Sequence, residues 1–164
     1  MKEAKRSDEM RKILINRLEN NHFANEIDIK IELIQYQKSR VSLKVSEKHL
    51  NPNGTIHGGV LMTLADNAAG TCVSYTGQPT PTLDLSYRFL KPVFAGDKVT
   101  ADAQVIQAGK TIIVVETNLH VAEKLVGTST ASFFRSDRNL PELPPETMDL
   151  ADKFIKDYIN KKSE

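Results

Sequence analysis

The spacing of apolar residues changes several times along the chain, and each spacing predicts a different kind of element. Between residues 8 and 19, apolar residues recur every three or four positions among charges, which predicts an amphipathic helix. Across residues 27–33 and 41–45 they alternate with polar residues, which predicts two half-buried strands joined by a turn at residues 36–39. A strand with only one apolar face is typical of an antiparallel sheet that is covered on one side.

The segment from Gly59 to about Tyr75 is largely apolar and rich in small residues. On a helix, its apolar positions cover an arc much wider than a surface stripe, so we expect a helix that is buried on most of its circumference. The Asn-Pro-Asn-Gly run at residues 51–54 predicts a turn before this helix, and Pro79 and Pro81 prevent its continuation.

Four more strands and a last helix follow. The strand patterns cover residues 83–89, 99–105, 111–121 and 126–134. Residues 146–161 return to helical spacing after Pro145, which suits a first helical turn. Strands dominate this order and most connections are of hairpin length, so we expect an α+β fold in which one antiparallel sheet wraps around one long buried helix.

Length, charge and cysteine content exclude several classes of protein. A chain of 164 residues is enough for one ordinary domain. The 22 basic and 21 acidic residues leave a net charge of +1, so no large field attracts nucleic acid or an anionic membrane. The single cysteine, Cys72, allows no internal disulfide, and its apolar helical position without a histidine partner predicts an inert core residue.

The chain also lacks the apolar segments that targeting and membrane insertion need. Residues 1–20 are studded with charges and contain no apolar core of a secretory signal. The longest aliphatic run, Ile112–Val115, is far shorter than the ~20 residues that span a bilayer. We therefore expect a cytoplasmic protein that binds neither membrane nor nucleic acid.

The start of the buried helix is the first candidate for chemistry. The chain has no phosphate-binding glycine loop, serine-hydrolase elbow or zinc-protease motif, and its four histidines lack metal-ligand spacing, so we expect no metal site. His57-Gly58-Gly59 leads directly into the helix, whose first N–H groups favour negative charge. Because glycine lacks a Cβ atom, a ligand carbonyl could approach these N–H groups closely, as in an oxyanion hole. The alternative is that the two glycines only let the loop turn tightly into the helix.

Asp66 is the second candidate, because it places a carboxylate in the middle of an otherwise apolar helix. A partly buried carboxylate needs hydrogen bonds or a function; the alternative is that it faces solvent beside Thr63 and Asn67. Asp66 lies eight residues beyond Gly58, which is roughly 12 Å along a helix. An aspartate side chain does not bridge that distance. A site that uses both residues therefore requires a second copy of the chain and lies at the interface of a homodimer.

Other polar residues are weaker candidates. Thr82 and Asp84 begin a strand and could line the mouth of a pocket or only cap the strand. Three basic residues could bind phosphates or simply be solvated: Arg88, Lys91 and Lys110.

Together these residues resemble a known family. The pattern comprises Asn51-x-x-Gly54-Thr55-x-His57-Gly58-Gly59, then Leu64-x-Asp66, Thr82-x-Asp84, Pro92-x-x-x-Gly96-Asp97 and Gly109-Lys110. Over about residues 24 to 134 the chain is similar to acyl-CoA thioesterases of the phenylacetic-acid-degradation type, in the 4-hydroxybenzoyl-CoA thioesterase superfamily of hotdog folds. The resemblance implies a hotdog domain at residues 24–135, between helical extensions at residues 1–23 and 136–164. It also implies a homodimer whose sheets join edge to edge, often paired again into a homotetramer.

The resemblance also implies a role for each candidate. Gly58, with Gly59 as a further candidate, would polarise the thioester carbonyl through its N–H, and Asp66 of the neighbouring chain would act as general base or nucleophile. The other implied roles are Asn51 holding the water, His57 orienting the loop near the thioester, Thr82 placing the water, and Arg88, Lys91 and Lys110 binding the nucleotide phosphates. The expected reaction is hydrolysis of an acyl-CoA to a free acid and CoA, without a metal or redox cofactor.

Two alternatives remain at this level. Hotdog domains also bind acyl-CoA without catalysis, and fold alone does not fix function. A hotdog dehydratase, which uses a histidine with an acidic residue, is the other. The intact set of Asn51, His57 and Asp66 favours the thioesterase, whereas the identity of the acyl group does not follow from the sequence.

Overall fold

The computed structural model describes residues 2–162, which form six strands and four α-helices. The elements are α1 (Lys2–Glu19), α2 (His22–Glu26), β1 (Lys30–Gln35), β2 (Lys38–Lys44), α3 (Gly58–Cys72), β3 (Thr82–Phe89), β4 (Lys98–Ala108), β5 (Ile112–Val121), β6 (Lys124–Phe134) and α4 (Pro145–Lys162). One short 3-10 helix, Glu47–His49, precedes α3, and a second, Val73–Thr76, follows it directly.

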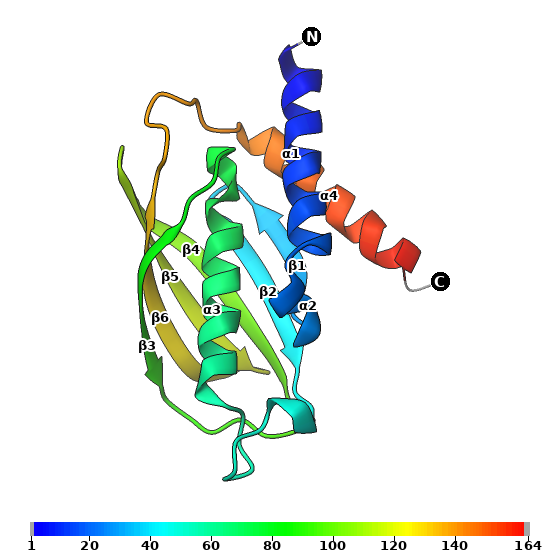
Figure 1. Ribbon diagram of the computed structural model, residues 1–164, viewed down its shortest axis with the longest axis vertical. Coiled ribbons are helices and arrows are strands. Elements are labelled where there is room, and N and C mark those ends of the chain that lie inside the picture. The colour runs from blue at the N-terminus through cyan, green and yellow to red at the C-terminus, as the bar shows by residue number, and fades with distance from the viewer. Residues whose placement is uncertain (1, 163–164) are drawn as a thin grey trace.

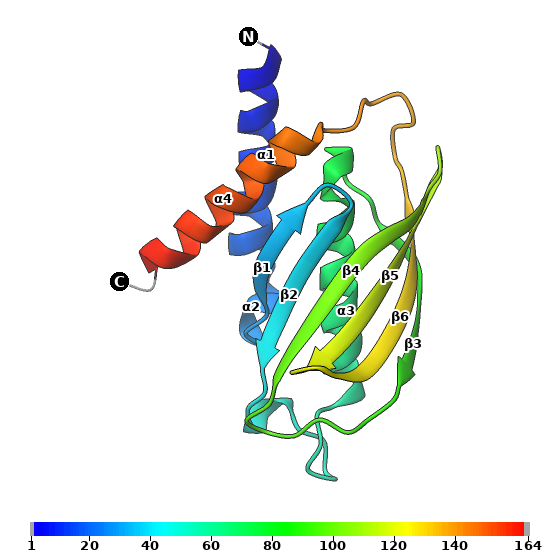
Figure 2. The same ribbon diagram turned by 180° about the vertical axis from the view of Figure 1, so that it is seen from behind.

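All six strands form one antiparallel sheet in the order β1-β2-β4-β5-β6-β3. Figure 2 shows the sheet from the side away from α3, with β1 and β3 at its two edges. After β2 the chain forms α3 and then returns to the sheet as β3, which lies at the edge opposite β1. A sheet wrapped around one long helix in this way is a hotdog fold, and it confirms the predicted α+β class.

The central helix α3 lies across one face of the sheet (Figure 1). Its sheet-facing side chains are at most 3% exposed: Leu61, Leu64, Ala65, Ala68, Ala69 and Cys72. The alanines let the helix approach the strands closely, and the Ser39 hydroxyl of β2 donates a buried hydrogen bond to the Ala68 carbonyl at 2.7 Å. This packing fixes the position of every residue that α3 carries.

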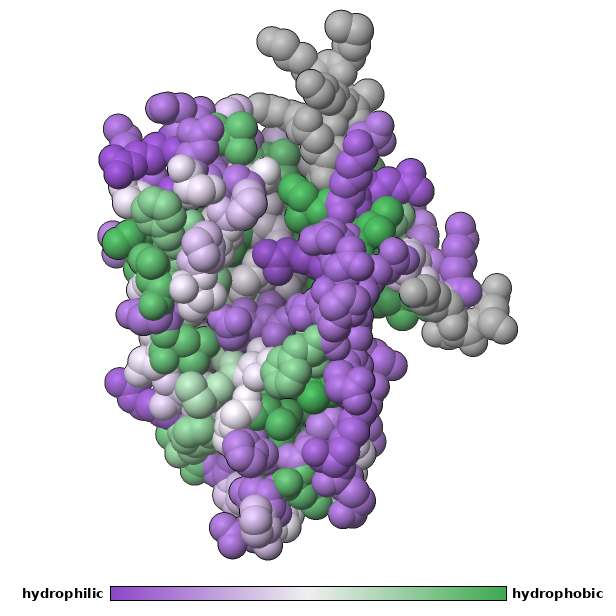
Figure 3. Space-filling model, in the orientation of Figure 1, coloured by the Kyte–Doolittle hydropathy of each residue, from purple (hydrophilic) through white to green (hydrophobic). Residues whose placement is uncertain are grey.

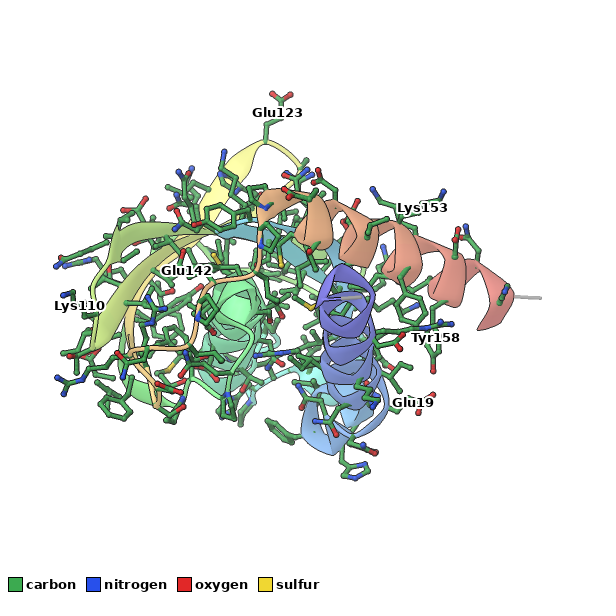
Figure 4. The ribbon with its side chains drawn as sticks, turned by 90° about the horizontal axis from the view of Figure 1, so that it is seen from above. Glu19, Lys110, Glu123, Glu142, Lys153 and Tyr158 are labelled. Carbon is green, nitrogen blue, oxygen red and sulfur yellow. The ribbon has the colours of Figure 1, made fainter. Side chains whose placement is uncertain are left out.

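The terminal helices α1 and α4 pack against each other beside β1 (Figures 1 and 2). From α4, the Asp152 carboxylate accepts a hydrogen bond from the Ile34 N–H of β1 at 3.1 Å. Figure 4 shows Glu19 of α1 and Tyr158 of α4 on the same side of the molecule, where the Tyr158 hydroxyl donates to the Glu19 carboxylate. The β1 edge of the sheet is therefore covered by the chain itself.

The alternation at residues 27–33 predicted a strand that begins too early. After α2, residues 27–28 form a turn, and β1 begins only at Lys30. Asp28, between them, has a φ of 60°, a left-handed conformation that interrupts extended backbone. A bulge between Ile31 and Leu33 then shifts the alternation, so that Ile31 and Ile34 are buried while Leu33 is only partly buried. The first helix begins at Lys2, six residues before its expected start at residue 8, and the other predicted strands and helices are present within a few residues of their expected bounds.

Candidate active site

The loop before α3 is built around Asn51. Its side-chain carbonyl accepts hydrogen bonds from the N–H groups of Asn53 and Thr55, at 2.9 and 3.4 Å. Its amide donates to the Thr55 hydroxyl at 2.9 Å. Gly54 has a φ of 77°, which glycine adopts without strain. These bonds form the turn that the sequence predicted, and they hold the Asn51 side chain in one orientation.

His57 caps the start of α3 and occupies one of its free N–H groups. The His57 Nδ1 accepts a hydrogen bond from the Gly59 N–H at 2.9 Å. Because Nδ1 accepts, the neutral imidazole carries its proton on Nε2, and the exposed ring can donate from there. The Gly58 N–H, in contrast, finds no acceptor in the described part of the chain. Of the two glycines, Gly58 is therefore the one with a donor left for a ligand.

A cavity of about 450 Å³ opens beside Gly58. Asn51, Phe89 and Lys91 contribute to its walls. A Cβ atom built on Gly58 would lie 3.0 Å from Cζ of the Phe89 ring, so a larger residue would have to displace that ring. Glycine at position 58 therefore keeps the approach to its N–H open.

Asp66 lies in a different cavity, of about 560 Å³, farther along α3. The Thr82 hydroxyl, at the start of β3, donates to the Asp66 Oδ1 at 2.9 Å. The Asp66 Oδ2 has no hydrogen bond or ion pair within residues 2–162, so it is available to accept a proton. Asp66 is partly buried, and Thr63 and Asn67 line the same cavity rather than an open surface.

Within one chain the two groups of residues form separate half-sites. The cavity at Gly58 and the cavity at Asp66 have no lining residue in common. Gly58 and Asp66 both lie on the uninterrupted helix α3, on which eight residues correspond to roughly 12 Å. The described chain therefore brings Asp66 together with Thr82, and Asn51 with Gly58, but it does not bring the two pairs together.

The three basic candidates also divide between the two ends of the sheet. Lys91 donates its N–H to the Val126 carbonyl, near Arg88, whereas Lys110 lies in the β4–β5 turn beside the Phe134 end of β6 (Figure 4). Eight residues of β6 separate these ends, which is roughly 26 Å. Within one chain, Lys110 and Lys91 therefore do not contact one phosphate group together.

The edge strand β3 exposes apolar side chains. Leu83 and Phe89, two of the apolar residues that alternate with polar residues along this strand, are each 55% exposed. Leu90 and Phe94 continue the exposed series beyond the strand. Figure 3 shows apolar surface on the β3 side of the molecule, at the left of that view. Because nothing in the described residues pairs with the outer edge of β3, its apolar side chains are left without cover.

Arg17 of α1 is a charged residue of this region that the sequence did not single out. It lines the same cavity as Asp66, and a Cβ atom built on Gly70 would lie 3.6 Å from its Nη1. Burial lowers the pKa of Arg17, and the charge of Asp66 opposes part of that shift. Only its position three residues after the buried Leu14 distinguishes Arg17 from the solvated charges of the same helix.

Cys72 lies in the core and not in either half-site. Its side chain is 0% exposed, and burial raises the pKa of its thiol to about 12. A thiol in this state is neither accessible nor nucleophilic, in agreement with the predicted inert role.

Two kinds of feature are absent from residues 2–162. This part of the chain holds no group of three or more side chains that could bind a metal ion together. It also contains no helix long and apolar enough to cross a membrane.

Comparison with known proteins gives the family. Residues 53–128 match the Thioesterase superfamily. The chain is 32% identical over 94 residues to acyl-coenzyme A thioesterase 13 of Homo sapiens, which covers 55% of this chain and 67% of that protein. The structure of the E. coli PaaI protein from the phenylacetic acid degradation operon is similar with a TM-score of 0.72 and 28% identity, covering 80% of this chain and 96% of the other. A hypothetical thioesterase protein of Streptococcus pneumoniae TIGR4, solved with coenzyme A, is similar with a TM-score of 0.64 and 27% identity, covering 71% and 91%.

These matches agree with the hotdog fold of the chain and show its family. It belongs to the thioesterase superfamily, as a hotdog-fold enzyme of the PaaI-like type that hydrolyses thioesters. The matched segment contains Gly58, Asp66 and Thr82, whereas Arg17 and the whole of α1 lie outside it.

Proposed function

We propose that this enzyme hydrolyses an acyl-CoA thioester to a free carboxylic acid and CoA, at a site shared by two copies of the chain. One observation carries the proposal. The helix α3 presents an unused N–H at Gly58 and, about two turns later, a carboxylate held by Thr82, each beside its own cavity. The names of the human relative and of the coenzyme A complex support CoA as the thiol part of the substrate.

A two-fold dimer would join the half-sites into complete ones. The uncovered edge of β3 is the surface that we propose for this contact, because its apolar side chains need cover. Two-fold pairing of β3 with its copy is antiparallel, so the Thr82 end of one strand approaches the Phe89 end of the other. Asp66 of one chain then comes toward Gly58 of its partner, and Lys110 of one chain toward Arg88 and Lys91 of the other, as a shared rim for the CoA phosphates.

The proposed reaction begins with attack on the thioester carbonyl carbon. Asp66 Oδ2 takes a proton from water, and the water oxygen forms a bond to that carbon. The carbonyl oxygen becomes an oxyanion, which accepts a hydrogen bond from the partner's Gly58 N–H. The intermediate then releases the CoA sulfur, which takes the proton, and the free acid remains. These steps require neither a metal nor a redox cofactor.

The remaining site residues hold these groups in place. Thr82 orients the Asp66 carboxylate through Oδ1 and leaves Oδ2 for the water. Asn51 fixes the loop that leads to Gly58 and helps to hold the water. The bond from the Gly59 N–H to His57 turns the imidazole so that its Nε2 can donate beside the thioester.

Asp66 can act as base, as written above, or as a nucleophile that forms a mixed anhydride before water attacks. A single turnover in ¹⁸O-labelled water detects the nucleophilic route when water attacks the anhydride at its aspartyl carbon. Hydrolysis of an anhydride at its aspartyl carbon would leave ¹⁸O in the Asp66 side chain, and general-base catalysis would leave it only in the product acid. Mass spectrometry of the peptide that contains Asp66 is the readout.

A second association is part of the proposal. Ile106 of β4 and Ile112 of β5 are 57% and 44% exposed at the same end of the sheet. We propose that this apolar surface joins two dimers into a tetramer. Sedimentation velocity of the purified protein distinguishes a monomer, a dimer and a tetramer directly.

The substitution Asp66→Asn tests the proposed chemistry. It keeps the size of the side chain but removes the group that accepts the proton, so we expect kcat for acyl-CoA hydrolysis to fall by about 10²-fold or more. The assay is thiol release from a panel of aryl, short-chain and long-chain acyl-CoA substrates. Asp149→Asn, at an exposed position on α4, is the matched control and is expected to keep wild-type activity.

Unchanged activity of Asp66→Asn would refute the proposed role of this residue. If the wild-type enzyme released thiol from no acyl-CoA in the panel, the proposed substrate class would be wrong.

A further inference from the structure

The cavity beside Asp66 contains polar groups that hydrolysis itself does not need. Its apolar walls come from Phe23, Met62, Pro81, Leu85 and Phe133. Beyond Asp66 and Thr82, it is also lined by Arg17, Asn21 and Asn67. An acyl group that occupies this cavity therefore meets charge and amide groups as well as apolar side chains.

Arg17 lies in this cavity without an anionic partner. Among the side chains that the structure describes, its guanidinium forms no ion pair and no hydrogen bond, and Asp66 acts on it only through space. Its place in the last turn of α1 suits the helix dipole but supplies no acceptor for its N–H groups. Arg17 is partly buried, and a guanidinium withdrawn from water is stabilised when an anion pairs with it, so Arg17 is available to a ligand.

Arg17 contacts α3 at a fixed distance from Asp66, and that distance sets the length of a ligand that reaches both residues. Its Nη1 lies over Gly70, 3.6 Å from where a Cβ atom would be. Gly70 is four residues after Asp66 and on the same face of the helix, roughly 6 Å along the axis. The two carboxyl carbons of an extended five-carbon dicarboxylic acid are roughly 5 Å apart, from C–C bonds of about 1.5 Å. A chain of this length would place one end beside Asp66 and the other beside Arg17.

The wall behind Arg17 is fixed and polar. The Asn21 amide donates to the Asn67 side-chain carbonyl at 2.7 Å, and the Asn67 amide donates to the Thr63 carbonyl at 2.9 Å. Asn21 and Asn67 also line a second cavity of about 370 Å³ beneath α1 and α2, so they stand between the two spaces. A long aliphatic tail would have to displace these hydrogen bonds, which disfavours it.

We infer that the acyl group of the substrate carries a carboxylate at its far end, and that Arg17 binds that carboxylate. The substrate class is an ω-carboxyacyl-CoA with an acyl chain of about four to six carbons. This inference rests on the proposed acyl-CoA hydrolysis and adds its specificity-determining residue. Arg17 belongs to α1, outside residues 53–128, which match the superfamily.

A matched pair of substrates tests the inference. Glutaryl-CoA and pentanoyl-CoA have acyl groups of five carbons, and only the first carries a far carboxylate. We expect wild-type kcat/KM to be about tenfold or more higher for glutaryl-CoA, since the unpaired guanidinium penalises the neutral chain.

Variants of Arg17 then assign this preference to the residue. Arg17→Met keeps the length and removes the charge, so kcat/KM for glutaryl-CoA should fall about tenfold or more, with that for pentanoyl-CoA unchanged or higher. Arg17→Lys should recover part of the loss. Lys12→Met removes a charge from an exposed position of the same helix and should change neither value.

Inhibition of the wild-type enzyme provides a test that does not depend on a variant folding. Free glutarate should inhibit hydrolysis of pentanoyl-CoA at concentrations about tenfold lower than free pentanoate does. Equal inhibition by the two acids would contradict the inference.

Three further outcomes separate this inference from the proposed function. A wild-type enzyme that hydrolyses pentanoyl-CoA as well as or better than glutaryl-CoA would overturn the inference and leave acyl-CoA hydrolysis standing. An equal loss on both substrates in Arg17→Met would also overturn it, because Arg17 would then position the site in general. No hydrolysis of either substrate would overturn the inference, and the proposed function would fail only if the enzyme also released thiol from no acyl-CoA in the panel.

Discussion

The first two N–H groups of α3 belong to neighbouring glycines but serve different purposes. His57 takes the donor of Gly59, and that bond fixes the direction of the imidazole. The donor of Gly58 is left over, beside a cavity whose wall includes the Phe89 ring. An oxyanion hole of this kind depends on one backbone atom, which a conventional side-chain substitution does not remove.

Proline at position 58 removes that atom. The first position of a helix tolerates proline, and His57 already has the extended conformation, with a ψ of 132°, that a residue before proline prefers. Because the N–H disappears while the helix start is kept, we expect Gly58→Pro to lower kcat by about 10² to 10³-fold in the thiol-release assay.

Gly58→Ala is the matched control for this prediction. Both variants add a Cβ atom that must displace the tip of the Phe89 ring, but only proline loses the donor. We expect the alanine variant to retain much more activity than the proline variant. Equal losses in both would mean that crowding, rather than the missing N–H, is responsible.

Local patterns in the sequence predicted Gly58 and Asp66 as candidates, and the family resemblance implied roles for Asn51 and His57. A glycine pair at a helix start and a carboxylate within an apolar helix are visible without tertiary structure. Arg17 could not be found in this way, because its contact with α3 joins positions about fifty residues apart and its own helix carries many solvated charges. The pairing of Asp66 with Thr82 likewise depends on how β3 crosses α3.

Within the secondary-structure elements, two glycines differ in the space that their surroundings leave for a Cβ atom. Gly70 lies within α3, and a Cβ atom there would make only ordinary contacts, the nearest at 3.6 Å. Gly127 lies in β6 directly beneath the Tyr87 side chain of β3, and a Cβ atom there would overlap the Tyr87 hydroxyl. The first glycine weakens its helix, whereas the second is required for β3 and β6 to pack.

We therefore expect opposite effects of alanine at these two positions. Gly70→Ala should raise the free energy of unfolding by up to about 1 kcal/mol, because alanine favours the helix. Gly127→Ala should lower it by about 1 to 3 kcal/mol, because β3 must shift to make room. Urea unfolding followed by circular dichroism measures both, and destabilisation by Gly70→Ala would contradict the contact geometry.

The element order was predicted well where the periodic pattern is long, as in α3 and β4 to β6. It was wrong at residues 27–33, where a left-handed Asp28 and a bulge interrupt an apparent alternation. It was incomplete for β3, whose alternation correctly indicated a strand but not that the strand lies uncovered at an edge. Edge position follows from the pairing of distant strands, which no local pattern contains.

At the scale of the whole molecule, the two edges of the sheet are treated differently. The β1 edge is covered by α4, through the hydrogen bond from Ile34 to Asp152. The β3 edge carries exposed apolar side chains and is left open. One covered edge and one open edge favour a pair of molecules over an extended fibre, because β3 can join only with another β3.

A site shared between two chains and a site within one chain predict different activities for a dimer of two different variants. In a heterodimer of Gly58→Pro and Asp66→Asn, one of the two sites receives both substitutions and the other receives neither. We expect such a heterodimer, purified through two different affinity tags, to recover about half of the wild-type kcat per dimer, although each parent homodimer is nearly inactive. If Gly58 and Asp66 of the same chain formed the site, both sites of the heterodimer would carry a substitution and activity would stay at the level of the parents. The thiol-release assay on the separated species decides between these outcomes, with a doubly tagged wild-type dimer as the reference.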